Sequence, residues 1–478
     1  MDIDKHSNFS EWFSTVLKDA KLVDLRYNVK GFIVILPWAF KTMKLMYNFA
    51  EAELEKRNHN PVNFPVVIPE SNLIKEEEHV KGFGGEVFWI THAGFNKLEE
   101  KLALRPTSET AMYPLYALWI KGKSDLPIKM YQSGAVWRYE TKATRPFIRG
   151  REFLWIETHD AFATKNEALN QVMEDIEILN VFLWDILGIP FIVLRRPQWD
   201  KFPGADDTYA ADTLMPDGKV LQIATTHMLG QKFSKPFNIK FMDEDGKEKF
   251  VWQTCFGIGM NRIYAALVAW HGDNKGLIYP FNLSPIQIVI VPIFKEENRE
   301  KVLKYAKQVY KKLKNKGFRV LLDDSDKTPG FKFNEWEFKG VPIRIEVGEK
   351  EINNEGVLIV PRDTGIRSFA SLNELVDNVM EESRAMMKRL KEKNWKEFEN
   401  SLKSALSFEE LKKKLEKGGI VRVPFCSLSN GVECYNKIKE ELKAEVRGEK
   451  VGEGKPQGLK CIVCGKEANH FVYVARQY

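Results

Sequence analysis

VWRYE, at residues 136–140, and RPFIRGREFLWIETHDAF, at residues 145–162, decide the fold of this chain. Residues two apart on a β-strand project from the same face, so the two segments predict an antiparallel hairpin with one polar face. Six polar side chains belong to that face: Arg138, Glu140, Arg149, Arg151, Glu157 and His159. A solvated sheet edge with surface ion pairs is one explanation. Large apolar residues such as Trp137, Phe153 and Trp155 crowd the same strands, however, which favours charges that line a cleft.

Arg-x-Glu, a loop and a returning strand rich in arginine resemble motif 2 of the class II aminoacyl-tRNA synthetases. The resemblance implies that Arg138 contacts the α-phosphate of ATP and the carboxylate of the amino acid. It places Glu140 at the adenine and Arg149 at the outer phosphates. These roles suit adenylate formation, because negative charge builds on the α-phosphate and a fixed guanidinium stabilises it. Arg138 is therefore expected to be catalytic.

Two further segments resemble the other motifs of this family, and they occur in the family's order. NFPVVIP, residues 63–69, resembles motif 1, which implies a homodimer formed through it. CFGIGMNR, residues 255–262, resembles motif 3. There Gly257 and Gly259 would let the nucleotide approach the backbone, and Arg262 would reach the γ-phosphate as a second catalytic arginine. Glycines at a strand end and an arginine on a helix are common, so the order of the three motifs carries the prediction.

The choice of amino acid is predicted by LRPTSET, residues 104–110, which resembles the T-x-E loop of prolyl-tRNA synthetases. In that loop a carboxylate, here Glu109, accepts a charge-assisted hydrogen bond from the secondary ammonium of proline, with the hydroxyl of Thr107 beside it. The same residues also suit a helix start. Both explanations can hold, because Thr107 can cap the helix while Glu109 faces the pocket.

QIATTHMLGQ, residues 222–231, resembles the substrate strand of the same family. The resemblance implies that Gln222 and Thr225 contact the nucleotide and that His227 lies at the proline, where it binds without transferring a proton. Three more side chains are expected to wall a small apolar pocket that suits a pyrrolidine ring: Phe83, Trp155 and His159.

The chain of 478 residues exceeds the usual size of one hydrophobic core, and its predicted elements separate into three regions. The expected fold class is α/β (α+β). Residues 1–283 are predicted to form an antiparallel-sheet catalytic domain of the class II synthetase type. Residues 284–385 alternate apolar strands with helices and predict an α/β domain with a mixed or parallel sheet. Residues 386–478 begin in a charged helix, expected over 372–417, and form a small α+β domain.

The second region resembles the anticodon-binding domain of class II synthetases, over residues 330–348 (GFKFNEWEFKGVPIRIEVG). Glu accepts from the guanine N1–H and N2 groups, and Arg or Lys meets O6 and N7. Two guanines in a proline anticodon therefore make Glu337 and Arg344 the expected base contacts, with Lys332 and Lys339 for phosphate or base. Each of the four could equally be an ordinary surface charge.

Four of the five cysteines gather near the end of the chain: Cys426, Cys434, Cys461 and Cys464. Four thiolates with a Cys-x2-Cys pair and a trailing glycine favour a structural, tetrahedral Zn²⁺ site over free thiols. Cys426 and Cys434 are more widely spaced than is usual in zinc motifs, so the sequence does not decide whether both of them are ligands. Cys255 stands alone and is expected to be a small buried residue.

The composition, with 29% charged residues and a net charge of +6, is that of a folded protein that tolerates a polyanionic partner. No apolar run is long enough for a membrane helix, and no signal peptide is evident, so a cytoplasmic location is expected. Lysine-rich segments in the last two hundred residues fit solvated helix faces.

The resemblance to prolyl-tRNA synthetases spans nearly the whole chain, and the cysteine-bearing tail with its final Tyr478 points to the archaeal and eukaryotic type. It implies a ligase that uses ATP with Mg²⁺ to activate L-proline and then charges tRNA(Pro). The bacterial type carries an editing insertion between motifs 2 and 3. Substrate-strand segments fill that interval here, so no editing domain is expected. Two rivals stay open: a sister class II enzyme for another amino acid, and a non-catalytic tRNA-binding paralogue.

Overall fold

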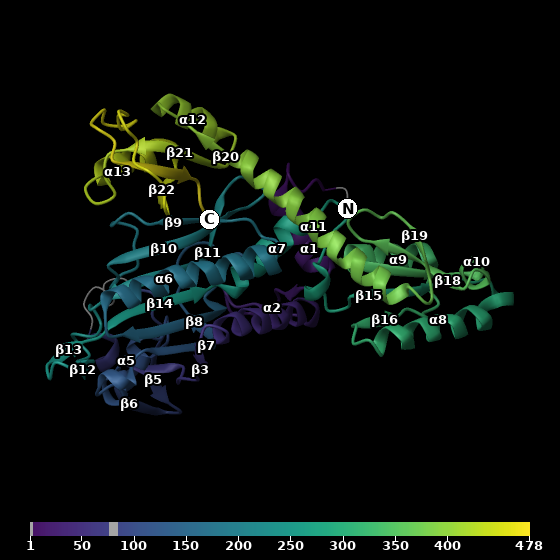
Figure 1. Ribbon diagram of the computed structural model, residues 1–478, viewed down its shortest axis with the longest axis horizontal. Helices are drawn as coiled ribbons and strands as arrows, with labels where there is room; N and C mark the ends of the chain where they lie inside the picture. The colour runs from purple at the N-terminus through teal and green to yellow at the C-terminus, as the bar shows by residue number, and fades with distance from the viewer. Residues whose placement is uncertain (1–2, 76–84) are drawn as a thin grey trace.

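The computed structural model describes residues 3–75 and 85–478 (Figure 1). Within these ranges the chain forms a large sheet, a separate five-stranded sheet, smaller sheets and the helices that cover them. The long helix α11 (Leu375–Ser401) runs from the five-stranded sheet to the far end of the large one. None of the helices in the described ranges is long and apolar enough to span a bilayer.

The large sheet combines strands from both halves of the chain. In chain order its strands are β3 (Asn60–Pro61), β7 (Ile128–Trp137), β8 (Glu152–Phe162), β9 (Ile192–Arg195), β10 (Asp207–Leu214), β11 (Val220–Gly230), β14 (Trp252–Ile258), β20 (Leu402–Ser404), β21 (Ile420–Phe425), β22 (Glu445–Lys450) and β23 (His470–Ala475). Across the sheet the order is β20-β21-β23-β22-β9-β10-β11-β14-β8-β7-β3. From β7 to β9 every neighbouring pair is antiparallel, as predicted for the catalytic domain.

The predicted β7–β8 hairpin is present, but its strands end earlier than the sequence indicated. β7 ends at Trp137 and β8 begins at Glu152, so the arginines and Glu140 between them lie in the connecting segment. One cross-strand bond continues the ladder there, from the backbone N–H of Arg138 to the carbonyl of Arg151. Beyond it the N–H of Glu140 donates to the carbonyl of Arg138, and Arg145 and Arg149 form an isolated bridge of their own. Arg138, Glu140, Arg149 and Arg151 therefore come from a folded loop at the end of the sheet, whereas Glu157 and His159 lie on β8.

Helices cover one face of the large sheet. They are α1 (Phe9–Asp19), α2 (Pro37–Glu55), α6 (Lys165–Leu179), the π-helical turn η2 (Asn180–Ile186) and α7 (Met260–His271). Ile156 of β8 and Ile258 of β14 share one buried core with Trp12 of α1 and Met46 of α2. Because strand side chains alternate between faces, the neighbours Trp155 and Gly257 point to the opposite face.

The five-stranded sheet is mixed, as predicted. Its elements are β15 (Ile288–Pro292), η4 (Glu296–Asn298), α8 (Arg299–Lys314), β16 (Val320–Leu322), α9 (Pro329–Phe338), β17 (Ile343–Val347), α10 (Glu349–Asn353), β18 (Gly356–Pro361) and β19 (Ser368–Ser371). The order is β16-β15-β17-β18-β19, and β15 is parallel to both of its neighbours. The strands and α8 enclose a core separate from that of the large sheet.

The expected single helix over 372–417 is wrong. α11 ends at Ser401, β20 follows, and α12 (Phe408–Glu416) starts afresh. The break has a local cause, because the hydroxyl of Ser407 accepts from the backbone N–H of Glu410 and caps a new helix. The predicted boundary between 385 and 386 lies inside α11, which is therefore shared by the two regions that it separates.

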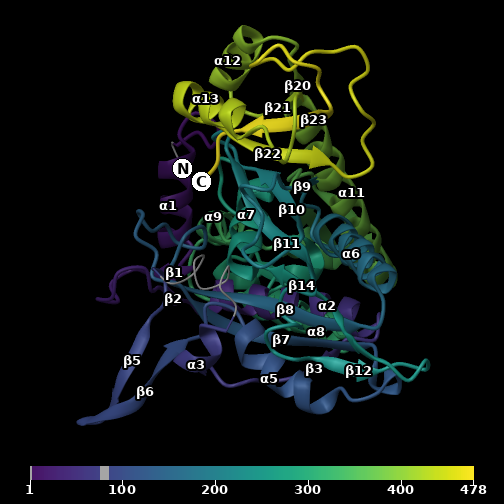
Figure 2. The same cartoon turned by 90° about the vertical axis from the view of Figure 1, so that its left-hand side faces the viewer.

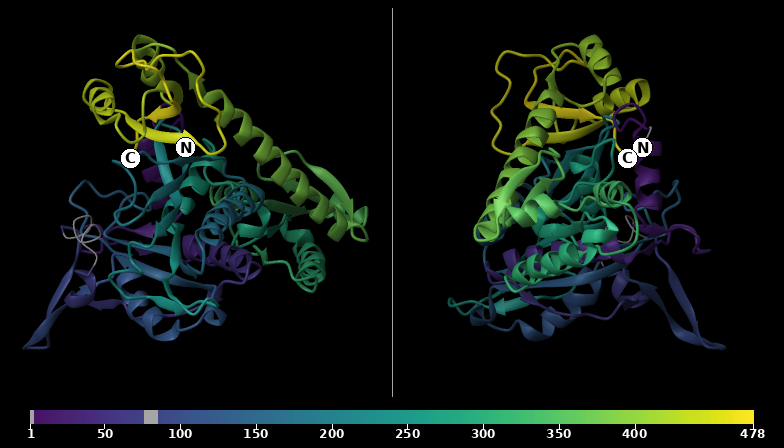
Figure 3. Two further views of the ribbon diagram at one scale, coloured as in Figure 1. Left: turned by 60° about the vertical axis from the view of Figure 1, so that its left-hand side comes forward. Right: turned by 90° about the vertical axis from the view of Figure 1, so that its right-hand side faces the viewer.

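The last region extends the large sheet. α12 and α13 (Val432–Leu442) lie beside β20 to β23, and these elements have a small core of their own (Figure 3). β22 pairs with β9, with Glu449 opposite Arg195, so the sheet continues from the cysteine-bearing region into the catalytic one.

The remaining elements are short strands and helices around these sheets. They are β1 (Val23–Asp24), β2 (Val34–Ile35), β4 (Val67–Pro69), α3 (Glu70–Leu73), β5 (Trp89–Ala93), β6 (Asn96–Leu104), α5 (Glu109–Trp119), η1 (Lys123–Asp125), β12 (Lys240–Met242), β13 (Glu248–Phe250) and η3 (Phe281–Leu283). The β5–β6 hairpin projects from the body (Figure 2). At its tip the side chain of Phe95 is fully exposed.

Candidate active site

A cavity of about 670 Å³ opens on the face of the large sheet opposite the helices. Its size is in the range of small-molecule sites. The floor comes from β8, β11 and β14, and the walls come from the loop after β7 and from residues 25–33.

The floor consists of rows of paired residues. Directly opposite residues on neighbouring strands share a face. One row across β11, β14 and β8 contains His227, Cys255 and His159. The next contains Thr225, Gly257 and Glu157. A Cβ at Gly257 would lie 3.4 Å from the ring of Trp155, so glycine keeps the floor open beside that ring.

Gly259 also has a packing role within the chain. A Cβ there would lie 3.0 Å from the backbone oxygen of Ile223, so the missing side chain lets two strands of the protein approach each other. The backbone N–H of Gly259 donates to that same oxygen at 2.9 Å. Gly259 still lines the cavity, but the chain itself already requires glycine there.

Three arginines converge at one end of the cavity. Arg138 donates from Nε to the carbonyl of Pro106 at 3.1 Å, and its guanidinium lies 5.3 Å from the ring centre of Phe153 and 5.6 Å from that of Trp155. Arg149 lies 3.9 Å from a carboxylate oxygen of Glu140. Both side chains line the cavity, as predicted.

Arg262 is held by backbone oxygens. Its Nε donates to the carbonyl of Ile148 and its Nη1 to that of Gln222, each at 3.0 Å. Burial, and then the charges of Arg138 and Arg149, lower the pKa of Arg262 to about 10. The guanidinium is still charged at neutral pH. Arg138 and Arg262 are held by neutral carbonyl oxygens, which leaves their charges available for a polyanion.

The other end of the cavity is built around a buried carboxylate that the sequence analysis assigned no role. Glu157 accepts from the backbone N–H of Ser108 at 3.1 Å, from Nε2 of Gln132 at 2.9 Å and from Nε2 of His159 at 3.0 Å. Thr107 in turn donates to Glu109. Glu157 therefore fixes the loop that carries the two predicted proline contacts. Glu157 is two residues from both Trp155 and His159 on β8, and therefore shares their face of the sheet. This spacing was the sequence signal that could have identified it as a cavity residue.

The pKa values of the two histidines of the cavity are shifted in opposite directions. Burial lowers the pKa of His159, but the hydrogen bond to Glu157 and nearby carboxylates outweigh it, so the pKa is raised. Burial and then the charge of Arg138 lower the pKa of His227 to about 3, so His227 is neutral. Its Nδ1 is 2.9 Å from Oγ1 of Thr208, and its Nε2 is 3.0 Å from Oγ1 of Thr225.

The predicted residues on the catalytic side are thus brought together around one cavity, with one exception: Phe83 lies outside the described residues. The ring of Phe202, which was not predicted, lies 4.6 Å from that of His227 and walls the same end. Phe202 lies on a loop, where periodicity offers no signal. Cys255 is buried in the floor, as expected.

A second polar group lies on the five-stranded sheet. Arg344 donates to Glu337 at 2.9 Å and to Glu346 at 3.0 Å. Lys339 donates to Glu335 at 3.0 Å. Lys332 is buried instead, with 1% exposure, and donates to the carbonyl of Asp323 at 2.8 Å. α9 turns this side chain inward, so its expected contact with a nucleic acid does not fit.

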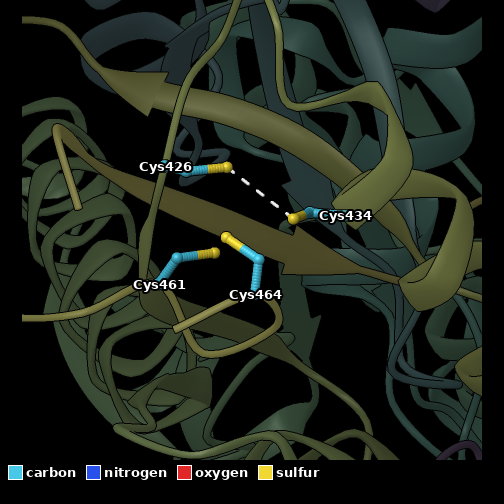
Figure 4. Close-up of side chains that lie close together, drawn as sticks. All are labelled: Cys426, Cys434, Cys461 and Cys464. Atoms are coloured by element: carbon cyan, nitrogen blue, oxygen red, sulfur yellow. Dashed lines mark hydrogen bonds between the residues drawn. The ribbon is translucent and has the colours of Figure 1, made fainter. Parts of the chain in front are cut away.

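The four clustered cysteines converge (Figure 4). Their Sγ atoms all lie within 4.8 Å of one another, and those of Cys426 and Cys434 are 3.7 Å apart. Four thiolates bound tetrahedrally at about 2.3 Å from Zn²⁺ would stand about 3.8 Å apart. The cluster, which includes both members of the widely spaced pair, therefore fits zinc.

Comparison with known proteins agrees with this geometry. Three family models match successive parts of the chain: the tRNA synthetase class II core domain (G, H, P, S and T) over residues 88–271, the anticodon binding domain over 287–382, and the prolyl-tRNA synthetase C-terminal domain over 408–478. A proline–tRNA ligase of Thermofilum pendens is 51% identical, and the match covers 100% of this chain and 98% of that protein. The chain belongs to the prolyl-tRNA synthetase family. It is of the archaeal type, with a C-terminal domain that carries a four-cysteine cluster.

Other prolyl-tRNA synthetases agree. The proline–tRNA ligase of Pyrococcus abyssi is 46% identical, over 98% of both chains. A solved prolyl-tRNA synthetase of Giardia lamblia, in complex with prolyl-adenylate, has a TM-score of 0.97 and 38% identity, and covers 100% of this chain and 99% of its own. The activity is therefore that of a proline–tRNA ligase, and the two rival functions are set aside.

Proposed function

We propose that the arginine end of the cavity binds ATP and performs proline activation. The carboxylate of proline attacks the α-phosphorus, the bond to the bridging oxygen breaks, and pyrophosphate leaves. Arg138 bridges the proline carboxylate and the α-phosphate, while Arg149 and Arg262 hold the outer phosphates. The convergence of three fixed guanidinium groups on one end of the cavity carries this assignment, because fixed charges stabilise developing negative charge without reorganising.

The remaining floor residues complete the nucleotide site. Glu140 and Gln222 contact the adenosine, with Thr225 and the open backbone at Gly257 and Gly259 beside it. ATP enters with Mg²⁺, whose preference for carboxylate and phosphate oxygens is met by acidic side chains that line the cavity.

Proline is placed at the opposite end. Glu109 accepts from its secondary ammonium, with Thr107 beside it. Trp155, His159 and His227 wall the ring, and Phe83 is proposed from the family resemblance alone. A neutral His227 suits this position, because it adds no further positive charge beside the ammonium.

Replacement of Arg138 tests the assignment. In proline-dependent exchange of pyrophosphate into ATP, Arg138→Met should lower kcat by about 10²–10³, as loss of one transition-state donor does. Arg299→Met, an exposed arginine of the five-stranded-sheet region, is the control and should leave the rate unchanged. A normal rate for Arg138→Met would remove the catalytic assignment.

The second half of the reaction needs tRNA(Pro). The 3′-terminal adenosine attacks the prolyl carbonyl carbon, and AMP leaves. Glu337, Arg344 and Lys339 are proposed to contact the anticodon. They group where the end of α9 meets β17, the central strand of the five-stranded sheet. Exposed Phe331 on the same helix supports this, because single-stranded bases stack on aromatic rings.

Zinc, the dimer and the domain division are further proposals. Cys426, Cys434, Cys461 and Cys464 would hold one structural Zn²⁺, which would fasten α13 and the end of β21 to the loop between β22 and β23. A homodimer would form through residues 63–69, and the 43% exposure of Val66 supports this. Sedimentation analysis tests the homodimer, and a monomer at micromolar concentration would exclude it.

The division into 1–283, 284–385 and 386–478 would be tested by limited proteolysis.

Proofreading is proposed to require another protein. Residues 163–251 form the helices and strands of the catalytic body, which supports the expectation that no editing domain is inserted. Incubation with alanyl-tRNA(Pro) tests this, and rapid deacylation would contradict it. We expect the enzyme to act in the cytoplasm.

A further inference from the structure

A buried ionic cluster joins the C-terminal region to the edge of the cavity. Asp212 of β10 accepts two hydrogen bonds from Arg196, at 3.0 and 2.7 Å. It accepts two more from Arg447 of β22, at 2.9 and 3.1 Å. Each of these residues is at most 2% exposed. Asp200 lies 3.7 and 3.8 Å from the two guanidinium groups and balances the second positive charge.

The cluster also holds Gln222. Nη2 of Arg196 donates to Oε1 of Gln222 at 2.8 Å, and Nη2 of Arg447 approaches the same oxygen at 3.4 Å. Asp212 and Gln222 are cross-strand partners at a register shift between Ala211 and Asp212. A bulge of this kind re-aims a side chain, and here it brings Gln222 to the cavity face, which it lines.

Two donors on the amide oxygen fix the orientation of the amide. The NH2 group of Gln222 must then point away from the guanidinium groups, because an amide has its acceptor and its donors on opposite sides. The backbone carbonyl of Gln222 meanwhile accepts from Nη1 of Arg262 at 3.0 Å. Gln222 thus links Arg447, in the C-terminal region, to an arginine of the cavity.

We propose that Arg447 is a positioning residue for ATP. Together with Arg196 and Asp212 it fixes the amide of Gln222, so that the NH2 group faces an acceptor oxygen or nitrogen of the nucleotide. It also steadies the carbonyl that holds Arg262. The inference rests on the proposed contact of Gln222 with ATP. Arg447 itself does not touch the substrate.

The same strand pair supplies a matched control. Arg195 and Glu449 also join β9 to β22, with 2.9 Å between Nε and Oε1. Their side chains contact Asp207 and His470, away from Gln222. Arg195→Met therefore breaks an ion pair across the same junction and leaves the amide of Gln222 in place.

Pyrophosphate exchange with varied ATP and varied proline separates the possibilities. Arg447→Met should raise the KM for ATP about tenfold, the effect of losing one well-made hydrogen bond, with the KM for proline changed less than about twofold. Arg447→Lys keeps a charge for Asp212 but lacks the planar fork, and should raise the KM for ATP about threefold. If Arg447→Met does not fold, the KM for ATP of Arg447→Lys tests the inference instead. Arg195→Met should leave both constants unchanged.

Two results would overturn the inference. One is a normal KM for ATP in both Arg447 variants; the other is an equal rise in both KM values with a lowered melting temperature, which would indicate a purely structural role. Gln222→Ala separates this failure from that of the proposed nucleotide contact. If Gln222→Ala also binds ATP normally, the contact itself is wrong. If it binds ATP weakly while the Arg447 variants are normal, only the positioning role fails.

Discussion

Replacement of Glu157 by glutamine tests how the proline end of the cavity is built. The carboxylate is 2% exposed and accepts hydrogen bonds at both of its oxygens. Glutamine keeps the size but turns one oxygen into a donor, which must then face another donor. Towards Ser108 it would meet a backbone N–H, which cannot turn. Towards Gln132 it would meet an amide already fixed, because the oxygen of Gln132 accepts from the backbone of Phe64 at 3.0 Å and from Arg105 at 3.2 Å.

The cost follows from this conflict. Each hydrogen bond to a charged acceptor contributes about 1.5–3 kcal/mol, and breaking a buried charged group away from its partners costs about 3–5 kcal/mol. We expect the loop of Thr107 to Glu109 to shift, because Ser108 is its anchor. The KM for proline should rise about 10- to 100-fold, while the KM for ATP, which is set at the other end, changes less than about threefold.

The assay is proline-dependent pyrophosphate exchange, with a thermal melt of each protein. Glu174→Gln is the control: Glu174 pairs with Lys129 at 2.6 Å, away from the cavity. A KM for proline within twofold of the original, with an unchanged melting temperature, would refute the role given to Glu157.

Three further results are expected. Metal analysis should find one zinc per chain, and Cys461→Ser should lose it and become sensitive to protease after about residue 402; a full zinc content in the variant would contradict the four-cysteine site. Glu337→Gln should raise the KM for tRNA(Pro) about tenfold in aminoacylation and leave pyrophosphate exchange unchanged, whereas equal effects on both would place Glu337 elsewhere. The raised pKa of His159 means that its ion pair with Glu157 stabilises the fold fully below about pH 6.5, and that this contribution is lost as pH rises through the raised pKa. Melting temperatures measured from pH 6 to 9 should therefore fall more steeply in the original protein than in Glu157→Gln.

Part of the cavity was predictable from the sequence, because strands that carry polar side chains at every second residue beside large aromatic residues are typical of a cleft. Arg138 and His159 were found in this way, whereas His227 came from the family resemblance. The position of Lys332 was not predictable, since a lysine that its helix turns towards Asp323 has the same local sequence pattern as an exposed one. Family resemblance supplied roles, but no local pattern distinguishes the inward face of a short helix.

The junction of Asp212 with Arg447 was equally out of reach. Its members are 235 positions apart, and each looks alone like an ordinary surface charge. Only the pairing of β22 with β9 buries them together, and strand pairing over such a distance has no local signal. The orientation of the Gln222 side chain has no local sequence signal either, because it is set by a β-bulge between β10 and β11.

The pairing of β9 with β22 has a consequence for how the chain is made. Arg195 leaves the ribosome 254 positions before its partner Glu449. At about 5–20 residues per second, β9 then waits roughly 13–50 s as an open flank of the nascent sheet. During that interval its unpaired backbone groups can join another polypeptide, so a chaperone that shields this flank would raise the yield of native enzyme more than one that acts on the finished chain.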